Sequence, residues 1–91
     1  MKIRLKGKVI EARECRSVWE KTRGLMFRKN PKPLVLIFKK PTREPIHSFF
    51  CKPFLAVWMI DGEVIERRVV KPFSLSVKPK EKFTHIFEIP L

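Results

Sequence analysis

The feature that most constrains the fold of this 91-residue chain is the pair Asp61-Gly62, which separates two segments of strand-like composition. Asp-Gly is the strongest short-range signal for a two-residue β-hairpin, because both residues of such a turn take positive φ values. The segment before the pair, residues 54–60, contains no polar residue and is predicted to be an interior strand. Residues 63–70 are predicted to pair with it in the antiparallel direction.

Prolines and glycines divide the rest of the chain into short pieces, as is typical of small β proteins. Residues 2–10 alternate between polar and apolar side chains and are predicted to form one strand. Residues 34–38 are all apolar, which indicates a strand covered on both faces. Further strands are predicted at residues 46–51 and 83–89, and lysine- and proline-rich loops at residues 39–45 and 71–82.

One short helix is predicted near residues 18–23. The segment Ser-Val-Trp-Glu at residues 17–20 fits a capping box, in which the serine caps the helix and the glutamate occupies its third position. Gly24 suits the left-handed residue that often follows a helix. The expected fold is therefore mainly β, a small barrel-like or strongly curved antiparallel or mixed sheet with one short helix. A chain of this length forms a single domain, residues 1–91.

Charge is the strongest compositional signal. Twenty-one Lys and Arg residues against nine Asp and Glu residues give a formal net charge of +12. The composition, without Gln and with one Asn, resembles that of thermophile proteins, but ion-pair networks use both signs and leave this excess unexplained. Residues 1–52 hold fifteen cations and four anions, whereas residues 53–91 hold six and five. The excess favours an anionic partner, such as nucleic acid (RNA more than DNA) or a phosphate-bearing ligand.

The first predicted strand carries a row of cations on one face, opposite an apolar face. The row consists of Lys2, Arg4, Lys6 and Lys8. At ~3.3 Å per residue its spacing is about 6.6 Å, close to the separation of neighbouring phosphates along an extended single strand. Lys39, Lys40 and Arg43 are further candidate contacts to nucleic acid. The alternative is a sheet-edge strand whose charges guard against aggregation.

Two other pairs of side chains are candidate ligand contacts. Phe49 and Phe50 point to opposite faces of their predicted strand, so one of them can be exposed and stack on a base. The alternative for both is core packing. Arg23 and Arg28 can line a small anion site, because guanidinium groups bind phosphate and carboxylate groups well. The alternatives are capping of the helix C-terminus by Arg23 and a surface salt bridge of Arg28.

The segment around these arginines resembles the family catalogued as domain of unknown function 192, whose members carry Gly-Leu-Met-x-Arg after a short helix. The resemblance rests on Gly24-Leu25-Met26-Phe27-Arg28, on Ser48-Phe49-Phe50, on the hairpin at residues 60–65 and on the closing Phe87-Glu88-Ile89-Pro90. It implies a compact β-barrel-like fold with one small helix, and it implies no activity. It also motivates the alternative function, a small-molecule-binding or enzymatic domain with a pocket near residues 24–28.

Groups that could perform catalysis are poorly placed. His47 and Cys51 lie about 13 Å apart on one predicted strand at ~3.3 Å per residue, whereas a nucleophile and its base need about 3 Å. The two Cys and two His residues also lack the paired spacing of structural zinc sites. The sequence therefore predicts no catalytic residue, no metal and no cofactor, and it favours a binding domain over an enzyme.

The compartment is predicted from what the chain contains. Its longest apolar run, residues 54–60, is too short to span a bilayer, and its first residues alternate like a strand rather than a signal peptide. We expect a cytoplasmic protein without a membrane partner. Two cysteines, Cys15 and Cys51, are then expected to stay reduced, and the thermophile-like composition leaves a disulfide between them as the alternative.

Overall fold

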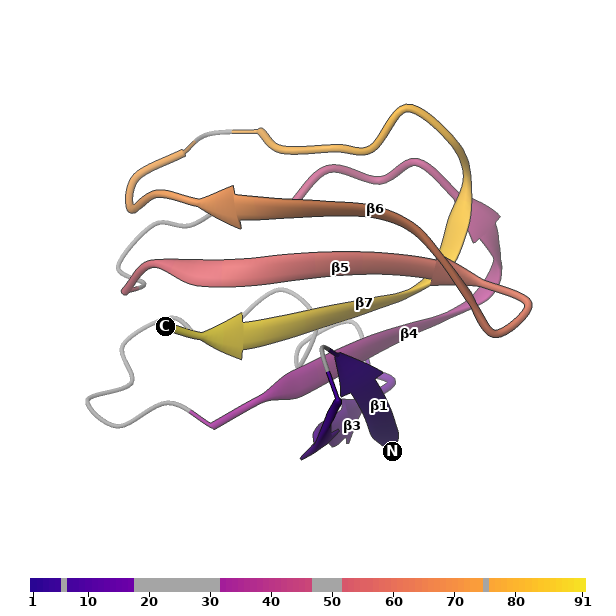
Figure 1. The fold of residues 1–91 in the computed structure, drawn as a ribbon. Coiled ribbons are helices and arrows are strands. Elements are labelled where there is room, and N and C mark those ends of the chain that lie inside the picture. The colour runs from indigo at the N-terminus through magenta and orange to yellow at the C-terminus, as the bar shows by residue number, and fades with distance from the viewer. Residues whose placement is uncertain (6, 18–31, 47–51, 75) are drawn as a thin grey trace.

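The computed structural model describes residues 1–5, 7–17, 32–46, 52–74 and 76–91. These residues form seven strands, which are β1 (Lys2–Leu5), β2 (Lys8–Glu11), β3 (Arg13–Cys15), β4 (Leu34–Thr42), β5 (Phe54–Ile60), β6 (Glu63–Val70) and β7 (Phe83–Pro90). Five strands form one sheet in the order β3-β4-β7-β5-β6, and β1 and β2 form a second, two-stranded sheet (Figure 1). The prediction of a mainly β fold is confirmed.

The five-stranded sheet is mixed and open. Strands β4, β7, β5 and β6 pair in antiparallel fashion, whereas the short β3 runs parallel to β4. Within the described part of the chain, β3 and β6 are the two ends of the sheet and do not pair with each other. The prediction of a mixed sheet is confirmed, and the prediction of a barrel-like closure is wrong. The predicted helix near residues 18–23 lies outside the described residues.

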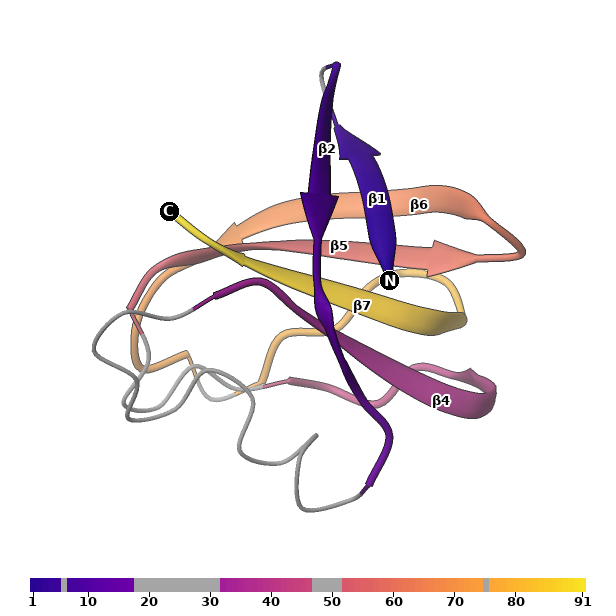
Figure 2. The same ribbon diagram turned by 90° about the horizontal axis from the view of Figure 1, so that it is seen from below.

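The centre of the sheet, formed by β5, β7 and the first half of β4, is buried on both faces. On one face, Val35, Val57 and Phe87 pack against the β1–β2 hairpin, which runs across the direction of the sheet strands (Figure 2). On the other face, the core includes Phe54 and Trp58, and Ile46 and Val77 from the connecting segments belong to the same cluster. Two buried faces explain why residues 34–38 of β4 and residues 54–60 of β5 are continuous apolar runs.

The chain reverses within the segment that was predicted to be one N-terminal strand. Gly7 has a φ of 79°, which a glycine adopts without steric cost, and β1 pairs with β2 across this turn. Leu5 is therefore opposite Lys8, and Arg4 is opposite Val9. Because opposite residues share a face, Lys8 lies on the face of Leu5 and not on the face of Arg4. The predicted single strand and its one-sided row of cations are both wrong.

Strand β4 is longer than its apolar core suggested. It continues through Lys39 and Lys40 to Thr42, which pairs with Phe83 after a shift in register. The prediction that a loop begins at residue 39 is therefore wrong, since the strand extends to Thr42, where it pairs with β7 again. Beyond it, Ile46 forms an isolated antiparallel bridge, and the rest of the strand predicted at 46–51 lies outside the described residues.

The predicted hairpin between β5 and β6 is confirmed. Ile60 pairs with Glu63, and the two turn residues Asp61 and Gly62 have φ values of 50° and 79°. Both values are positive, as a two-residue turn that matches the twist of the strands requires.

Replacing Gly62 by Val is expected to destabilise the protein by about 1–2 kcal/mol, because a side chain branched at Cβ resists a left-handed backbone. Gly62→Asn is the matched control, since asparagine tolerates this conformation far better. Urea unfolding followed by tryptophan fluorescence measures both. Equal midpoints for the valine and asparagine variants would show that the turn imposes no such requirement.

Candidate anion-binding surface

Two segments that are far apart in the sequence run side by side at the end of the sheet where β4 finishes and β7 begins. Thr42 pairs with Phe83, and the backbones of Ile46 and Val77 exchange two hydrogen bonds of 2.8 Å. The segments 39–46 and 77–83 are therefore antiparallel neighbours. Their apolar residues Ile46, Val77 and Phe83 are buried, so the polar residues between them are left at the surface.

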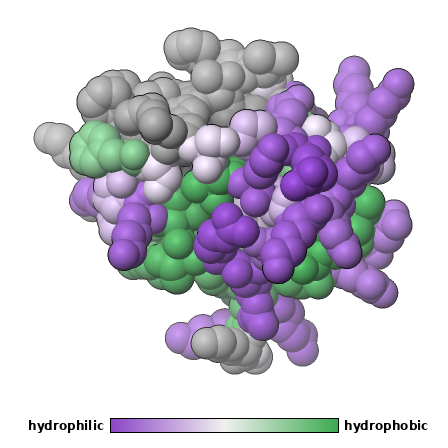
Figure 3. Space-filling view, turned by 90° about the horizontal axis from the view of Figure 1, so that it is seen from above, coloured by the Kyte–Doolittle hydropathy of each residue, from purple (hydrophilic) through white to green (hydrophobic). Residues whose placement is uncertain are grey.

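This arrangement brings six exposed cations onto two neighbouring segments. We define the basic end by these residues, Lys39, Lys40, Arg43, Lys78, Lys80 and Lys82. Glu44 and Glu81 are the two acids in the same segments, so six cations against two anions leave a charge of +4. Figure 3 shows hydrophilic side chains gathered on the side of the molecule where β4 ends and β7 begins.

Half of the basic end was missed by the sequence prediction. Lys39, Lys40 and Arg43 were predicted as candidate contacts, whereas the lysines at 78, 80 and 82 were assigned only to a loop in the nearly neutral half of the chain. They were missed because charge was counted separately for the two halves of the sequence, whereas the fold brings residues of both halves together at this point. The available signal was the alternation of lysines along residues 78–82.

Two side chains, one just after β4 and one on β6, hold the loop that carries these lysines. The Arg43 guanidinium donates from Nε and Nη2 to the carbonyl oxygen of Pro79, at 3.3 and 3.2 Å. The backbone N–H of Lys80 donates to Oε1 of Glu66 at 3.1 Å, and Arg68 forms an ion pair with the other carboxylate oxygen. Partial burial alone would raise the pKa of Glu66, but the bonds from Lys80 and Arg68 outweigh it and lower the pKa.

The cations of the N-terminal hairpin form a separate group. The hairpin packs through Ile3 on one face of the sheet, whereas Ile46 and Val77 beneath the basic end belong to the core on the opposite face. The exposed cations of this group are Lys2, Arg4 and Lys8, and Lys2 is directly opposite Glu11. In the described part of the chain, the hairpin and the basic end are therefore associated with cores on opposite faces of the sheet.

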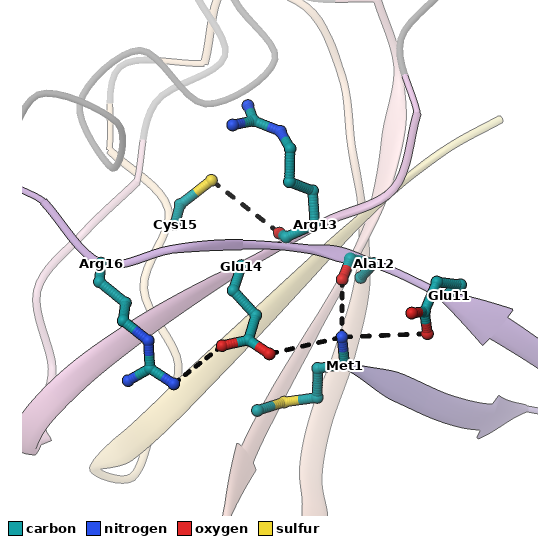
Figure 4. A network of polar contacts seen from close by, with 7 residues as sticks. All are labelled: Met1, Glu11, Ala12, Arg13, Glu14, Cys15 and Arg16. Atoms are coloured by element: carbon teal, nitrogen blue, oxygen red, sulfur yellow. Dashed lines mark hydrogen bonds and ion pairs between the residues drawn. The ribbon is translucent and has the colours of Figure 1, made fainter.

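Acidic side chains at the base of the hairpin further reduce its positive charge. The ammonium group of Met1 donates to the carbonyl of Ala12 at 2.9 Å and lies 3.9 Å from Glu11 and 3.6 Å from Glu14 (Figure 4). Glu14 also accepts a hydrogen bond of 2.8 Å from Arg16, which is the main reason why its pKa is lowered. These ion pairs neutralise part of the positive charge beside the hairpin.

Several predicted site residues lie outside the part of the chain that the structure describes. These are Lys6, Arg23, Arg28, Phe49 and Phe50, together with the rest of the segment 24–28. Their proposed contacts, and the pocket near residues 24–28, therefore remain predictions.

Groups with the potential for redox or metal chemistry are sparse in the described ranges. Cys15 is a buried thiol that forms no disulfide, and Cys51 lies outside these ranges. Among the described residues, no three His, Cys, Asp or Glu side chains gather as a metal site would require. The same ranges contain no helix with the length and apolar character needed to cross a membrane.

Glu88 is a buried carboxyl group that the sequence prediction passed over. It lies on β7 directly between Leu34 of β4 and Ala56 of β5, and it is only 4% exposed. Burial raises its pKa to about 8, so the folded protein holds it mainly as a neutral acid at pH 7. The available signal was a single acid between Phe87 and Ile89 near the end of a largely apolar strand.

Known proteins resemble this chain in fold. No family model matches the chain, and no curated protein matches it. A protein of unknown function from Novosphingobium aromaticivorans DSM 12444 superposes with a TM-score of 0.81 at 17% identity, over 90% of this chain. The match spans 64% of the length of that protein.

A second solved structure gives the same result. A protein from Sinorhizobium meliloti 1021, described as a putative transcription regulator, superposes with a TM-score of 0.84 at 14% identity. This match covers 98% of the present chain and 76% of the other. At these identities the two likenesses establish a shared fold, and they leave the function to be inferred from the site.

Proposed function

We propose that this domain binds a polyanionic partner through the basic end, and that single-stranded RNA is the class of partner that suits it best. The observation that carries the proposal is the gathering of six exposed cations on two neighbouring segments with only two acids among them. A polyanion that neutralises the lysines among these cations releases its own condensed counterions, which drives binding without any sequence-specific contact.

The shape of the surface supports a single strand over a duplex. Reading the major groove of DNA requires a helix or a two-stranded ribbon that fits into it. The basic end is instead formed by the end of β4 and the loop before β7, and no helix occurs among the described residues. A charged surface that follows a flexible backbone is the usual arrangement for single strands. DNA single strands and other phosphate-bearing ligands share this chemistry and should bind to the same residues.

The salt dependence of RNA binding gives the direct test. If the five lysines of the basic end each neutralise one phosphate, the slope of log Kobs against log salt should be about −3.5, from about −0.7 per contact. The variant Lys78→Ser/Lys80→Ser/Lys82→Ser should bind more weakly with a slope about 2 units shallower. Fluorescence anisotropy with a labelled single-stranded RNA across a salt series measures both values.

The matched control is Lys2→Ser/Arg4→Ser/Lys8→Ser, which removes the same number of positive charges, three, from the hairpin. This variant should keep most of the wild-type slope. Two results would refute the proposal: no binding by the wild type at low salt, or equal losses in the two triple variants. Equal losses would indicate that total charge, and not the basic end, attracts the polyanion.

A further inference from the structure

One peptide bond in the basic end is held at both of its polar groups by charged side chains. The contacts of Arg43 and Glu66 meet on the same unit, because the carbonyl of Pro79 and the N–H of Lys80 belong to one peptide group. The cation contacts the carbonyl and the anion contacts the N–H, so each charge faces the end of the peptide dipole that it attracts. Both contacts are charge-assisted hydrogen bonds, which are stronger than neutral ones.

The two charged groups come from distant parts of the fold. Arg43 follows β4 and is 36 residues from Pro79, and Glu66 lies on β6 and is 14 residues from Lys80. Glu66 is itself held by Arg68, whose guanidinium carbon lies 5.6 Å from the centre of the Trp58 ring. Trp58 is fully buried, so this chain of contacts connects the loop to the core. Stacking on an aromatic ring favours one orientation of a guanidinium group.

We propose that Arg43 and Glu66 are positioning residues, which fix the Pro79–Lys80 peptide and thereby hold the lysines at 78, 80 and 82 in place for a polyanion. This inference rests on the proposed function. Neighbouring cations repel one another, and an unrestrained loop would have to lose conformational freedom when it binds. Ordering the loop in advance removes that cost from the binding free energy. Arg43 thus acts through the loop rather than as a phosphate contact.

Substitutions of Glu66 separate positioning from charge. Glu66→Gln and Glu66→Ala remove the same negative charge, but only glutamine keeps an oxygen that can accept from the Lys80 N–H. Simple electrostatics predicts that both variants bind RNA equally well and more tightly than the wild type. Positioning predicts that Glu66→Ala binds about fivefold more weakly than Glu66→Gln, as expected for one lost hydrogen bond.

Arg43 is tested in the same way. Arg43→Ala and Lys40→Ala each remove one cation from the basic end, but only the first removes the contact with Pro79. Arg43→Ala should weaken RNA binding several-fold more than Lys40→Ala. Hydrogen exchange at the Lys80 amide, measured without RNA, should become faster in Glu66→Ala and stay slow in Glu66→Gln.

The outcomes distinguish the inference from the function on which it rests. If the wild type fails to bind RNA, the proposed function is wrong, and the positioning role for binding is withdrawn with it. If the wild type binds and the two Glu66 variants have equal affinities and equal Lys80 exchange, the function stands and the positioning role is refuted. Urea unfolding of each variant checks that the differences do not come from a loss of global stability.

Discussion

Raising the pH from about 5 to about 9 is expected to lower the free energy of unfolding by about 4 kcal/mol through one residue, Glu88. Burial raises the pKa of this carboxyl group from 4.5 to about 8. Between those two values the folded state binds more protons than the unfolded state, so stability falls as the pH rises. The contribution is complete below pH 4.5 and is lost above pH 8.

Among the described residues, the strand neighbours of Glu88 supply no charge that would cancel this effect. Leu34 and Ala56 flank it directly, and the next residue in the same row is Arg68 on β6, whose guanidinium pairs with Glu66. Charge–charge stabilisation of an ionised Glu88 is therefore weak, and desolvation determines the direction of the shift.

Glu88→Gln isolates the contribution of this residue, because glutamine has nearly the same shape and cannot ionise. The variant should be about as stable as the wild type near pH 5 and several kcal/mol more stable near pH 9. Other groups, including His85, whose pKa is lowered mainly by burial, titrate in both proteins and cancel in the difference. Urea unfolding of both proteins at a series of pH values measures this difference in the free energy of unfolding. Parallel stability profiles would contradict the burial of an ionisable group at this position.

Replacing Phe83 by Ala is expected to cost about 3–5 kcal/mol, a large part of the stability of a small domain. The ring is fully buried at the start of β7 and packs edge-on against Phe38, with ring centres 5.4 Å apart. Its removal leaves a cavity in the core on the face beneath the basic end. Urea unfolding measures this loss, and the variant should show a lower midpoint or fail to fold.

Phe73→Ala is the matched control, because the same atoms are removed from a side chain that is 64% exposed. Its effect should stay within about 0.5 kcal/mol, which is the usual range for surface positions. A loss of less than about 1 kcal/mol for Phe83→Ala, or equal losses for the two variants, would contradict the assigned core.

The sequence by itself determined the local elements in which one backbone preference dominates. Asp61 and Gly62 form the predicted turn because both residues accept a positive φ, whatever surrounds them. The apolar runs that form β4 and β5 became strands buried on both faces, since burying these runs requires cover on each side. The last strand, β7, also lies where its composition placed it.

Gly7 shows where a local signal had two meanings. Its lack of a side chain was consistent with a bulge in one long strand and with a reversal of the chain. Packing decided for the reversal, because a hairpin places Ile3 and Ile10 opposite each other and both on the core. The alternation of residues 2–10 fits either outcome, so periodicity could not distinguish them.

Only the tertiary structure decided which charged residues meet and which are buried. Arg43 contacts Pro79, and Glu66 contacts Lys80, because β4 and β7 are neighbours in the sheet and the loop before β7 reaches β6. Glu88 is buried because β7 lies between β4 and β5. Strand order depends on the free energy of packing the whole chain, whereas a sequence pattern reports preferences over a few neighbouring residues. The turn could therefore be predicted from two residues, and the basic end required the complete sheet.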